Sequence, residues 1–326
     1  MRLQKQITGI FSCLGILVLI LDGRTALNGA AAGLELCLKT VIPSLFPFLF
    51  LCSLLTNSLW GLRSSRMQWI SRRLGIPEGA ESILISAILG GYPAGAQTVG
   101  SAFQMGSLAK EDALHLLTFC SNPGPAFLFG MTSAVFPDKG VILCLWMIQI
   151  LSALLTAITG HHTPNHSASL PASDPSASEV LVRTIRTMAV ICGWVLLFRV
   201  VAAFLEHWVL FRFSPAVQVF ISGLLELSNG CISLGLIDNI ALRFVMCSVF
   251  LSAGGLCVTM QTVSVIGGLS PILYLTGKLR QTLFSLVLSL LYLHLGWIVL
   301  MILGIFLLVF PVKTKIKGGF PSLQGV

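Results

Sequence analysis

The sequence predicts an all-α protein: a polytopic membrane helix bundle with two repeats, each containing an interrupted (helix–break–helix) segment. Hydrophobic residues make up 55% of the 326 residues and charged residues only 10%, whereas soluble domains carry about 25% charged residues. Residues 140–160 and 282–311 contain no charged side chain, and about 20 apolar residues cross the hydrocarbon core of a bilayer. Glycine- and proline-rich breaks interrupt several apolar segments in both halves of the chain.

Charge and cysteine usage exclude several other classes. The formal net charge is +8, but the basic residues lie mainly between apolar segments, which favours membrane lipids as partners and no nucleic acid. The nine cysteines have no CxxC spacing and nearly all lie in apolar runs, so we expect no disulfide framework and no metal site. No catalytic triad spacing, nucleotide-binding glycine loop or HExxH motif is present, so we expect neither an enzyme nor a cofactor.

The first candidate spans are residues 7–21 and 30–60. The first resembles a signal peptide, but no small-residue cleavage site follows closely, which favours an uncleaved helix. Pro43 and Pro47 are expected to interrupt the second. A basic loop with Arg63, Arg66, Arg72 and Arg73 follows, and its charge places it in the cytoplasm.

Two broken segments complete the first half. Residues 80–103 are interrupted around Gly90, Gly91, Pro93 and Gly95, and each flank of about 10 residues spans only about 15 Å as a helix. Two half-helices meeting inside the membrane are therefore expected. Residues 113–136 are broken in the same way at Pro123 and Gly124, and residues 140–160 then cross the membrane again.

The composition changes at residues 161–181, which are rich in Ser, Pro and Ala and are predicted to form a disordered linker. Its histidines (His161, His162 and His166) could bind a metal, but a solvated linker is the favoured interpretation. The predicted division is 1–160 for the first membrane half, with an extra N-terminal helix before the first repeat, and 182–312 for the second. A basic cytoplasmic tail, 313–326, follows.

The second half contains apolar segments 180–208, 216–235 and 241–268, the last interrupted at Gly254 and Gly255. Lys278 and Arg280 are predicted to mark a loop. Residues 282–310 are longer than one upright span needs, which predicts a tilt or a break near Gly296.

Residues 90–99 align without gaps to residues 254–263, with five identities that include the glycine pair and the glutamines Gln97 and Gln261. Paired interrupted segments, one in each half, are typical of transporters built from repeats, with a site at the repeat interface. Alternatively, the spacing Gly91-x-x-x-Gly95 serves only close helix packing.

Four polar residues inside apolar segments are the predicted ligand-binding residues: Gln97, Asn122, Glu226 and Gln261. Breaks at membrane depth leave backbone groups that need partners, and an acid inside a membrane segment is costly unless it has a function. We expect the four side chains to converge on one polar cavity near the midplane. Two alternatives stay open, a structural pair of Glu226 with Arg199 and a helix-capping role for Asn122.

The ordered motifs PSLFPF at 43–48, GYPAGA at 91–96 and FCSNPGPAF at 119–127, followed by GLLEL at 223–227 and AGGL at 253–256 with Gln261, resemble the YlbJ-type sporulation integral membrane proteins. The resemblance covers residues 7–310. It implies a nucleoside recognition (gate) domain, a multi-pass protein of the cell membrane and a role in spore formation. Members of that family often have a second Asn where this chain has Ser121.

Two functional hypotheses follow. The first is a transporter or gated permease for a small polar solute such as a nucleoside, because a transporter uses broken helices with polar residues. The alternative is a non-transporting membrane scaffold or signalling component of spore envelope assembly. A homo-oligomer and spore-envelope partners also stay open.

Overall fold

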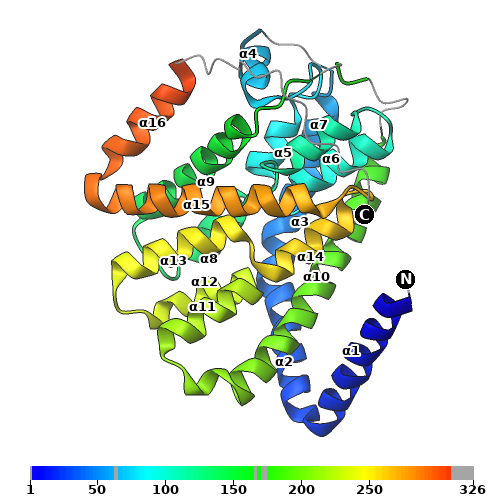
Figure 1. The fold of residues 1–326 in the computed structure, drawn as a ribbon, viewed down its shortest axis with the longest axis vertical. Coiled ribbons are helices and arrows are strands. Elements are labelled where there is room, and N and C mark those ends of the chain that lie inside the picture. Colours follow the sequence, from blue (N-terminus) through cyan, green and yellow to red (C-terminus); the bar gives the residue numbers. More distant parts are fainter. Residues whose placement is uncertain (1, 62–64, 165–166, 170–174, 310–326) are drawn as a thin grey trace.

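The computed structural model describes residues 2–61, 65–164, 167–169 and 175–309. These residues form an all-α bundle (Figure 1). Among the described residues, four helical segments are long and apolar enough to cross a membrane: Gly23–Ser58, Lys139–Thr159, Ala177–Trp208 and Ile240–Val265. The fold and these segments indicate a multi-pass membrane protein, as the composition predicts.

The N-terminal helix α1 (Arg2–Leu21) lies apart from the bundle (Figure 1), and the chain turns at Asp22 into α2 (Gly23–Leu36). A π-helical turn, Cys37–Val41, joins α2 to α3 (Ile42–Ser58) without a break. The prediction that Pro43 and Pro47 interrupt this segment is therefore wrong. Proline removes one backbone donor, and the π-helical turn lies directly before Pro43, where a change in helical hydrogen bonding is accommodated inside the helix.

Helix α2 packs closely against α10 (Ala177–Trp208) because two glycines bring the backbones together. A Cβ atom on Gly29 would lie 2.9 Å from the Ala203 Cβ, and one on Gly33 would lie 3.0 Å from the Leu196 Cα. This small-xxx-small contact is a common way for membrane helices to associate. Where α2 begins and α10 ends, Trp208 Nε1 donates a hydrogen bond to Asp22 Oδ2 at 3.2 Å.

After α4 (Ser65–Leu74), both predicted breaks of the first half are confirmed. Helix α5 (Ile83–Leu89) ends at Gly90, and α6 begins at Ala94 and ends at Gln104. Helix α7 (Lys110–Leu117) is separated from α8 (Pro125–Thr132) by irregular backbone that includes Pro123. Helix α9 (Lys139–Thr159) then runs unbroken, as the sequence predicts.

The described part of the predicted linker is irregular backbone held to the bundle at specific points. Ala168 N donates to Glu78 O at 2.8 Å, and Ser169 N donates to Ser107 O at 3.1 Å. Helix α10 begins earlier than expected, at Ala177, because Ser176 and Glu179 form a capping box that satisfies backbone donors of the first turn.

The second half contains two broken segments in succession. Helix α11 (Pro215–Leu225) is followed by Glu226, which is the capping residue between α11 and α12 (Leu227–Ser233). Helix α13 (Ile240–Ala253) ends at Gly254, and α14 (Gly255–Val265) follows. The break at Gly254 is confirmed, and its φ of +75° favours glycine. The break at Glu226 was not foreseen. Short 3-10 turns at Leu210–Arg212 and Leu234–Leu236 lie in the connections before α11 and after α12.

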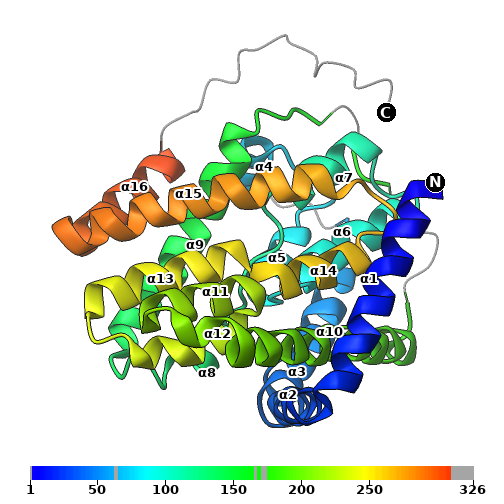
Figure 2. The same cartoon turned by 60° about the horizontal axis from the view of Figure 1, so that its bottom comes forward.

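Helix α15 (Pro271–Leu295) crosses the bundle over α13 and α14 and ends at Gly296, where α16 (Trp297–Val309) folds back (Figures 1 and 2). The predicted break near Gly296 is confirmed, and its φ is +65°. The predicted loop at Lys278 and Arg280 is wrong, because both residues lie inside α15. The basic tail 313–326 lies outside the described residues.

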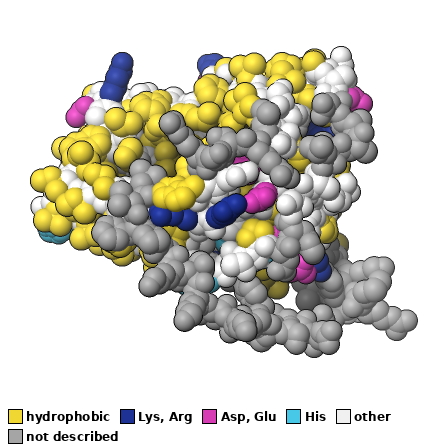
Figure 3. Space-filling view, turned by 90° about the horizontal axis from the view of Figure 1, so that it is seen from above, with side chains coloured by type: hydrophobic (Ala, Val, Ile, Leu, Met, Phe, Trp, Pro, Cys, Tyr) yellow, Lys and Arg dark blue, Asp and Glu magenta, His cyan; other side chains and the backbone are white. Residues whose placement is uncertain are grey.

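Hydrophobic side chains cover most of the described surface in the view of Figure 3, and charged side chains are few. Large aliphatic side chains are exposed on several helices, for example Ile20 at 73%, Leu279 at 64% and Ile298 at 65%. So much exposed apolar surface exceeds what a soluble monomer presents and suits contact with lipid tails.

Candidate functional site: polar groups at the helix breaks

Lys278 lies at the centre of the polar interior, with only 5% of its surface exposed. Its Nζ donates to Gln281 Oε1 at 2.9 Å, to Ser252 O at 3.3 Å and to the Tyr92 hydroxyl at 3.4 Å, and it also donates to Ser121 O. The ammonium also lies 4.9 Å from the centroid of the Tyr92 ring, a cation–π distance. No carboxylate of the described residues forms an ion pair with it.

The partners of Lys278 belong to three different breaks. Tyr92 lies between α5 and α6, Ser121 lies between α7 and α8, and Ser252 lies in the last turn of α13 before Gly254. The two carbonyl acceptors are backbone groups at or beside chain interruptions, where an intrahelical donor is lacking or poorly placed. One side chain from α15 therefore joins the three interruptions.

Asn122 is part of the same network. Gln281 Nε2 donates to Asn122 Oδ1 at 2.7 Å, while Asn122 Nδ2 donates to Phe119 O at 2.8 Å and Ala87 O at 3.2 Å. Asn122 is buried and satisfies the freed carbonyl of Phe119 after α7. The capping alternative is the one this geometry shows, and a ligand role for Asn122 stays a prediction.

Glu226 caps α12. Its carboxylate accepts hydrogen bonds from Ser228 N at 3.0 Å and Asn229 N at 2.6 Å, which satisfies two donors of the first turn and places negative charge at the positive end of the helix. The side chain is 2% exposed. It forms no ion pair with Arg199 among the described residues, so the alternative of a direct structural pair is not realised here.

Glu226 and Gln261 line one small interior cavity together with Tyr92. The cavity measures about 30 Å³, room for about two water molecules. Gln261 Nε2 contacts the Cys257 sulfur at 3.2 Å. Through the Tyr92 hydroxyl this cavity adjoins the Lys278 network, so two of the four predicted residues share a cavity and a third, Asn122, belongs to the neighbouring network.

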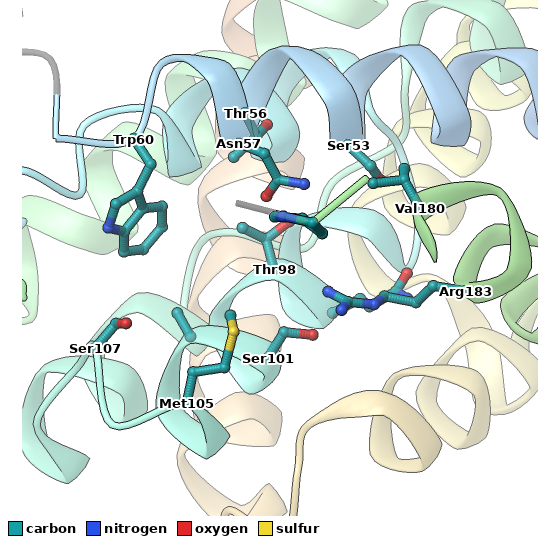
Figure 4. Close-up of a pocket in the computed structure, with 13 residues that line it drawn as sticks. Ser53, Thr56, Asn57, Trp60, Thr98, Ser101, Met105, Ser107, Val180 and Arg183 are labelled. Carbon is teal, nitrogen blue, oxygen red and sulfur yellow. The ribbon is translucent and has the colours of Figure 1, made fainter. Parts of the chain in front are cut away.

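Gln97 lies elsewhere. Its Nε2 donates to Thr187 Oγ1 of α10 at 2.7 Å, and it lines a pocket of about 50 Å³ between the C-terminal end of α3, α6 and the start of α10 (Figure 4). The structure thus does not bring all four predicted residues to one cavity. A helix side chain faces one direction only, and the α6 face that carries Gln97 points toward α10.

Close backbone contacts explain the predicted glycines at the breaks. A Cβ on Gly95 would lie 1.7 Å from Cys120 O, and one on Gly91 would lie 3.0 Å from Gly124 N. The break between α5 and α6 therefore packs directly on the break between α7 and α8. Gly255 approaches the end of α11 in the same way, with its Cβ position 3.0 Å from Leu224 O.

A second polar cluster lies outside the four candidate spans. His162 Nε2 lies 2.6 Å from Asp112 Oδ1, and His115, stacked on His162, bonds to Leu74 O at 2.8 Å. Burial lowers the pKa of His115 to about 4. Within the described ranges, no group of three or more His, Cys, Asp or Glu side chains is arranged to hold a metal ion.

Lys278 and Gln281 are the residues that the sequence argument missed. The signal that identifies them is a polar stripe in α15: Lys278, Gln281, Ser285 and Ser289 recur at spacings of 3 and 4 and are all buried. That spacing places them on one helix face. Ser285 and Ser248 form a further interhelical hydrogen-bond set with Gln149 Nε2, which donates to Ser285 Oγ at 3.2 Å.

The fold and the polar interior define a multi-pass α-helical membrane protein with broken helices joined at a buried lysine. Comparisons with protein-family models, with curated proteins and with solved structures find no match to this chain.

Proposed function

We propose that the protein transports a small polar solute, such as a nucleoside, across the cell membrane, and that it serves spore formation. One observation carries the transport proposal: three helix breaks meet at Lys278, and the fourth, at Glu226, borders the adjoining cavity. Interrupted helices at membrane depth cost backbone hydrogen bonds. Transporters use them because broken helices supply polar backbone groups to a solute and hinge points for alternating access. The sporulation role rests on the family resemblance of the motifs.

The small cavity at the helix breaks favours a second candidate, a non-transporting scaffold or signalling component. This cavity of about 30 Å³ holds water but no nucleoside. Under the transport proposal this arrangement is a closed state, and the breaks must separate to admit solute. Under the scaffold proposal the breaks stay joined.

Uptake measurements separate the two. Full-length protein in proteoliposomes is tested with a panel of labelled nucleosides, nucleobases, sugars and amino acids, with protein-free liposomes as the baseline. We expect uptake of at least one solute, and we expect Glu226→Gln to reduce it at least tenfold, whereas Arg212→Gln, outside the interior, leaves it unchanged. Absence of uptake for the whole panel, together with normal sporulation of cells carrying Glu226→Gln, would overturn the transport proposal.

A further inference from the structure

A polar groove lies at one end of the bundle, where α3, α6, α10 and α14 meet. Its inner part is the pocket of about 50 Å³ in Figure 4, and it opens to a surface depression of about 670 Å³. Gln97, Ser101, Met105 and Arg183 line both parts, so the two form one continuous groove. It is separate from the Lys278 network, and its outer part has the volume range of small-molecule sites.

The groove is positively charged. Arg183 and Arg186 line its outer part, and among the residues that the structure describes no Asp or Glu lines either part. The two arginines are three residues apart on α10 and therefore share one helix face. Glu179 lies one turn before Arg183, but its Oε2 caps the helix by accepting from Ser176 N at 2.7 Å and Ser176 Oγ at 3.0 Å. Neither arginine forms an ion pair with another described residue, although Glu179 lines a neighbouring surface depression together with both of them.

Neutral hydrogen-bonding groups share the rest of the lining with apolar side chains such as Met105 and Val180. Figure 4 shows Arg183 reaching from α10 across the pocket toward Ser101 of α6. The Ser101 hydroxyl has no hydrogen-bond partner in the part of the chain that the structure describes, and Asn57 also faces the pocket. Gln97 is held in place by its hydrogen bond to Thr187. Two guanidinium groups beside hydroxyl and amide donors form a donor set for a multivalent oxyanion.

We propose that this groove binds a phosphate group. Guanidinium groups bind phosphate oxygens through paired hydrogen bonds, and two guanidinium groups offer more donors than a single carboxylate can use. Arg183 and Arg186 also lie within the first three turns of a candidate membrane span, close to the level of lipid head groups. The phosphate therefore comes from a phospholipid head group or from a soluble phosphorylated molecule. This binding does not depend on transport.

Thermal unfolding of the full-length protein in a neutral detergent tests the proposal, because a ligand of the folded state raises Tm. The probes are inorganic phosphate, with chloride at equal ionic strength as control, and a short-chain phosphatidylglycerol, with the matching diacylglycerol, which has no phosphate, as control. The variants are Arg183→Gln/Arg186→Gln and the single Arg186→Gln, which keeps the inner pocket intact if the double variant does not fold. Arg212→Gln, an exposed arginine at the other end of α10, is the matched control.

We expect phosphate, phosphatidylglycerol or both to raise Tm of the wild type and of Arg212→Gln, and the groove variants to bind about tenfold more weakly. A shift with inorganic phosphate alone identifies a soluble phosphorylated ligand, and a shift with phosphatidylglycerol alone identifies a lipid head group. The proposal is overturned if neither probe exceeds its control, or if the groove variants respond as the wild type does.

Discussion

At the scale of single residues, Lys278 is the side chain that connects the helix breaks in the polar interior. Its ammonium satisfies the carbonyl of Ser121, between α7 and α8, and the carbonyl of Ser252, in the last turn of α13. A buried acceptor that loses its donor costs about 1–3 kcal/mol. The consequence of removing this one side chain should therefore appear at several breaks together.

We predict that Lys278→Met lowers the free energy of unfolding by several kcal/mol, on the order of two unsatisfied carbonyls. Thermal unfolding in detergent measures the loss. Arg280→Met, two residues along the same helix and only half-buried, is the matched control and should change stability little. A Lys278→Met protein as stable as the control variant would show that the ammonium contacts contribute nothing net.

Lys278→Ala gives a sharper version of the same test. The vacated space is lined by carbonyl, amide and hydroxyl oxygens, so ethylammonium should partly restore Tm by binding there. Tetramethylammonium has the same charge but no N–H donor and should not. Equal effects of the two cations would indicate an ionic-strength effect rather than occupation of the lysine site.

His115 supplies a pH-dependent prediction outside the candidate spans. Because burial lowers its pKa from 6.5 to about 4, the folded protein binds fewer protons than the unfolded chain between these pH values. Stability is therefore full above pH 6.5 and falls as the pH drops toward 4, by about 3 kcal/mol in total. Thermal unfolding across this range, compared with His115→Gln, isolates the contribution, since other titrating groups are common to both proteins. Parallel curves for the two proteins would contradict it.

At the scale of helices, the breaks are packing units as well as interruptions. Gly95 of α6 lies against Cys120 O in the next break, and Gly277 of α15 lies against Thr118 O, where a Cβ would approach to 2.4 Å. Neither carbonyl can move without shifting its helix. These contacts hold α5–α6, α7–α8 and α15 in register around Lys278.

We predict that Gly95→Ala prevents normal folding or costs more than about 3 kcal/mol, because its Cβ would overlap backbone. Gly193→Ala is the control: nothing lies within 4 Å of its Cβ position in the middle of α10, and the change should be neutral or stabilise the helix by up to about 1 kcal/mol. Yield of monodisperse protein and Tm in detergent check both. Equal behaviour of the two variants would show that the break does not pack as described.

The sequence predicts some of the helix breaks correctly and misses others. The breaks at Gly90–Gly95, Pro123, Gly254 and Gly296 were predictable, because glycine and proline act locally on the backbone. The break at Glu226 was not predictable. It depends on a carboxylate that accepts hydrogen bonds from two backbone amides, and an apolar run does not reveal such an arrangement. Pro47 was misjudged because a proline inside a packed membrane helix can be accommodated.

The site was less predictable than the fold. Gln97 and Gln261 occupy matching sequence positions, yet one faces α10 and the other a cavity with Glu226. Lys278 looked like a loop residue because a charge usually marks the end of an apolar run, and its partners come from segments 26 to 186 residues away. Such partners are set by tertiary packing, which a local sequence pattern does not encode.

The relation between the two halves remains a prediction at this scale. The matching decapeptides pair α5–α6 with α13–α14. The order of elements suggests another pairing, because each half has two broken segments in succession between long helices, which pairs α5–α6 with α11–α12 and α7–α8 with α13–α14. A superposition of the two halves distinguishes the pairings, because α5–α6 must superpose on α13–α14 in the first and on α11–α12 in the second.

At the scale of the whole molecule, the charge distribution orients the protein. The segment Gly23–Ser58 runs antiparallel to α10, since Asp22 meets Trp208 at one end and Gln97 and α3 lie near the start of α10 at the other. The end near Ser58 carries Arg72, Arg73, Arg183 and Arg186, whereas the end near Asp22 carries Arg24 and Arg212 beside the acidic groups Asp22 and Glu206. We therefore expect the basic end to face the cytoplasm.

We predict that a cysteine introduced at Arg72 is shielded from a membrane-impermeant maleimide in intact cells, whereas one introduced at Ser214 is labelled. Both positions are exposed in the structure and lie at opposite ends of α10. In permeabilised cells both positions should be labelled, which establishes that each thiol is reactive. The protein without an introduced cysteine gives the background labelling of the native cysteines, of which seven are buried. Because the phosphate groove opens at the same end as Arg72, this experiment also decides which leaflet or compartment supplies its ligand. Strong labelling at Arg72→Cys in intact cells, with protection at Ser214→Cys, would reverse the orientation of the bundle and place the groove on the outer face.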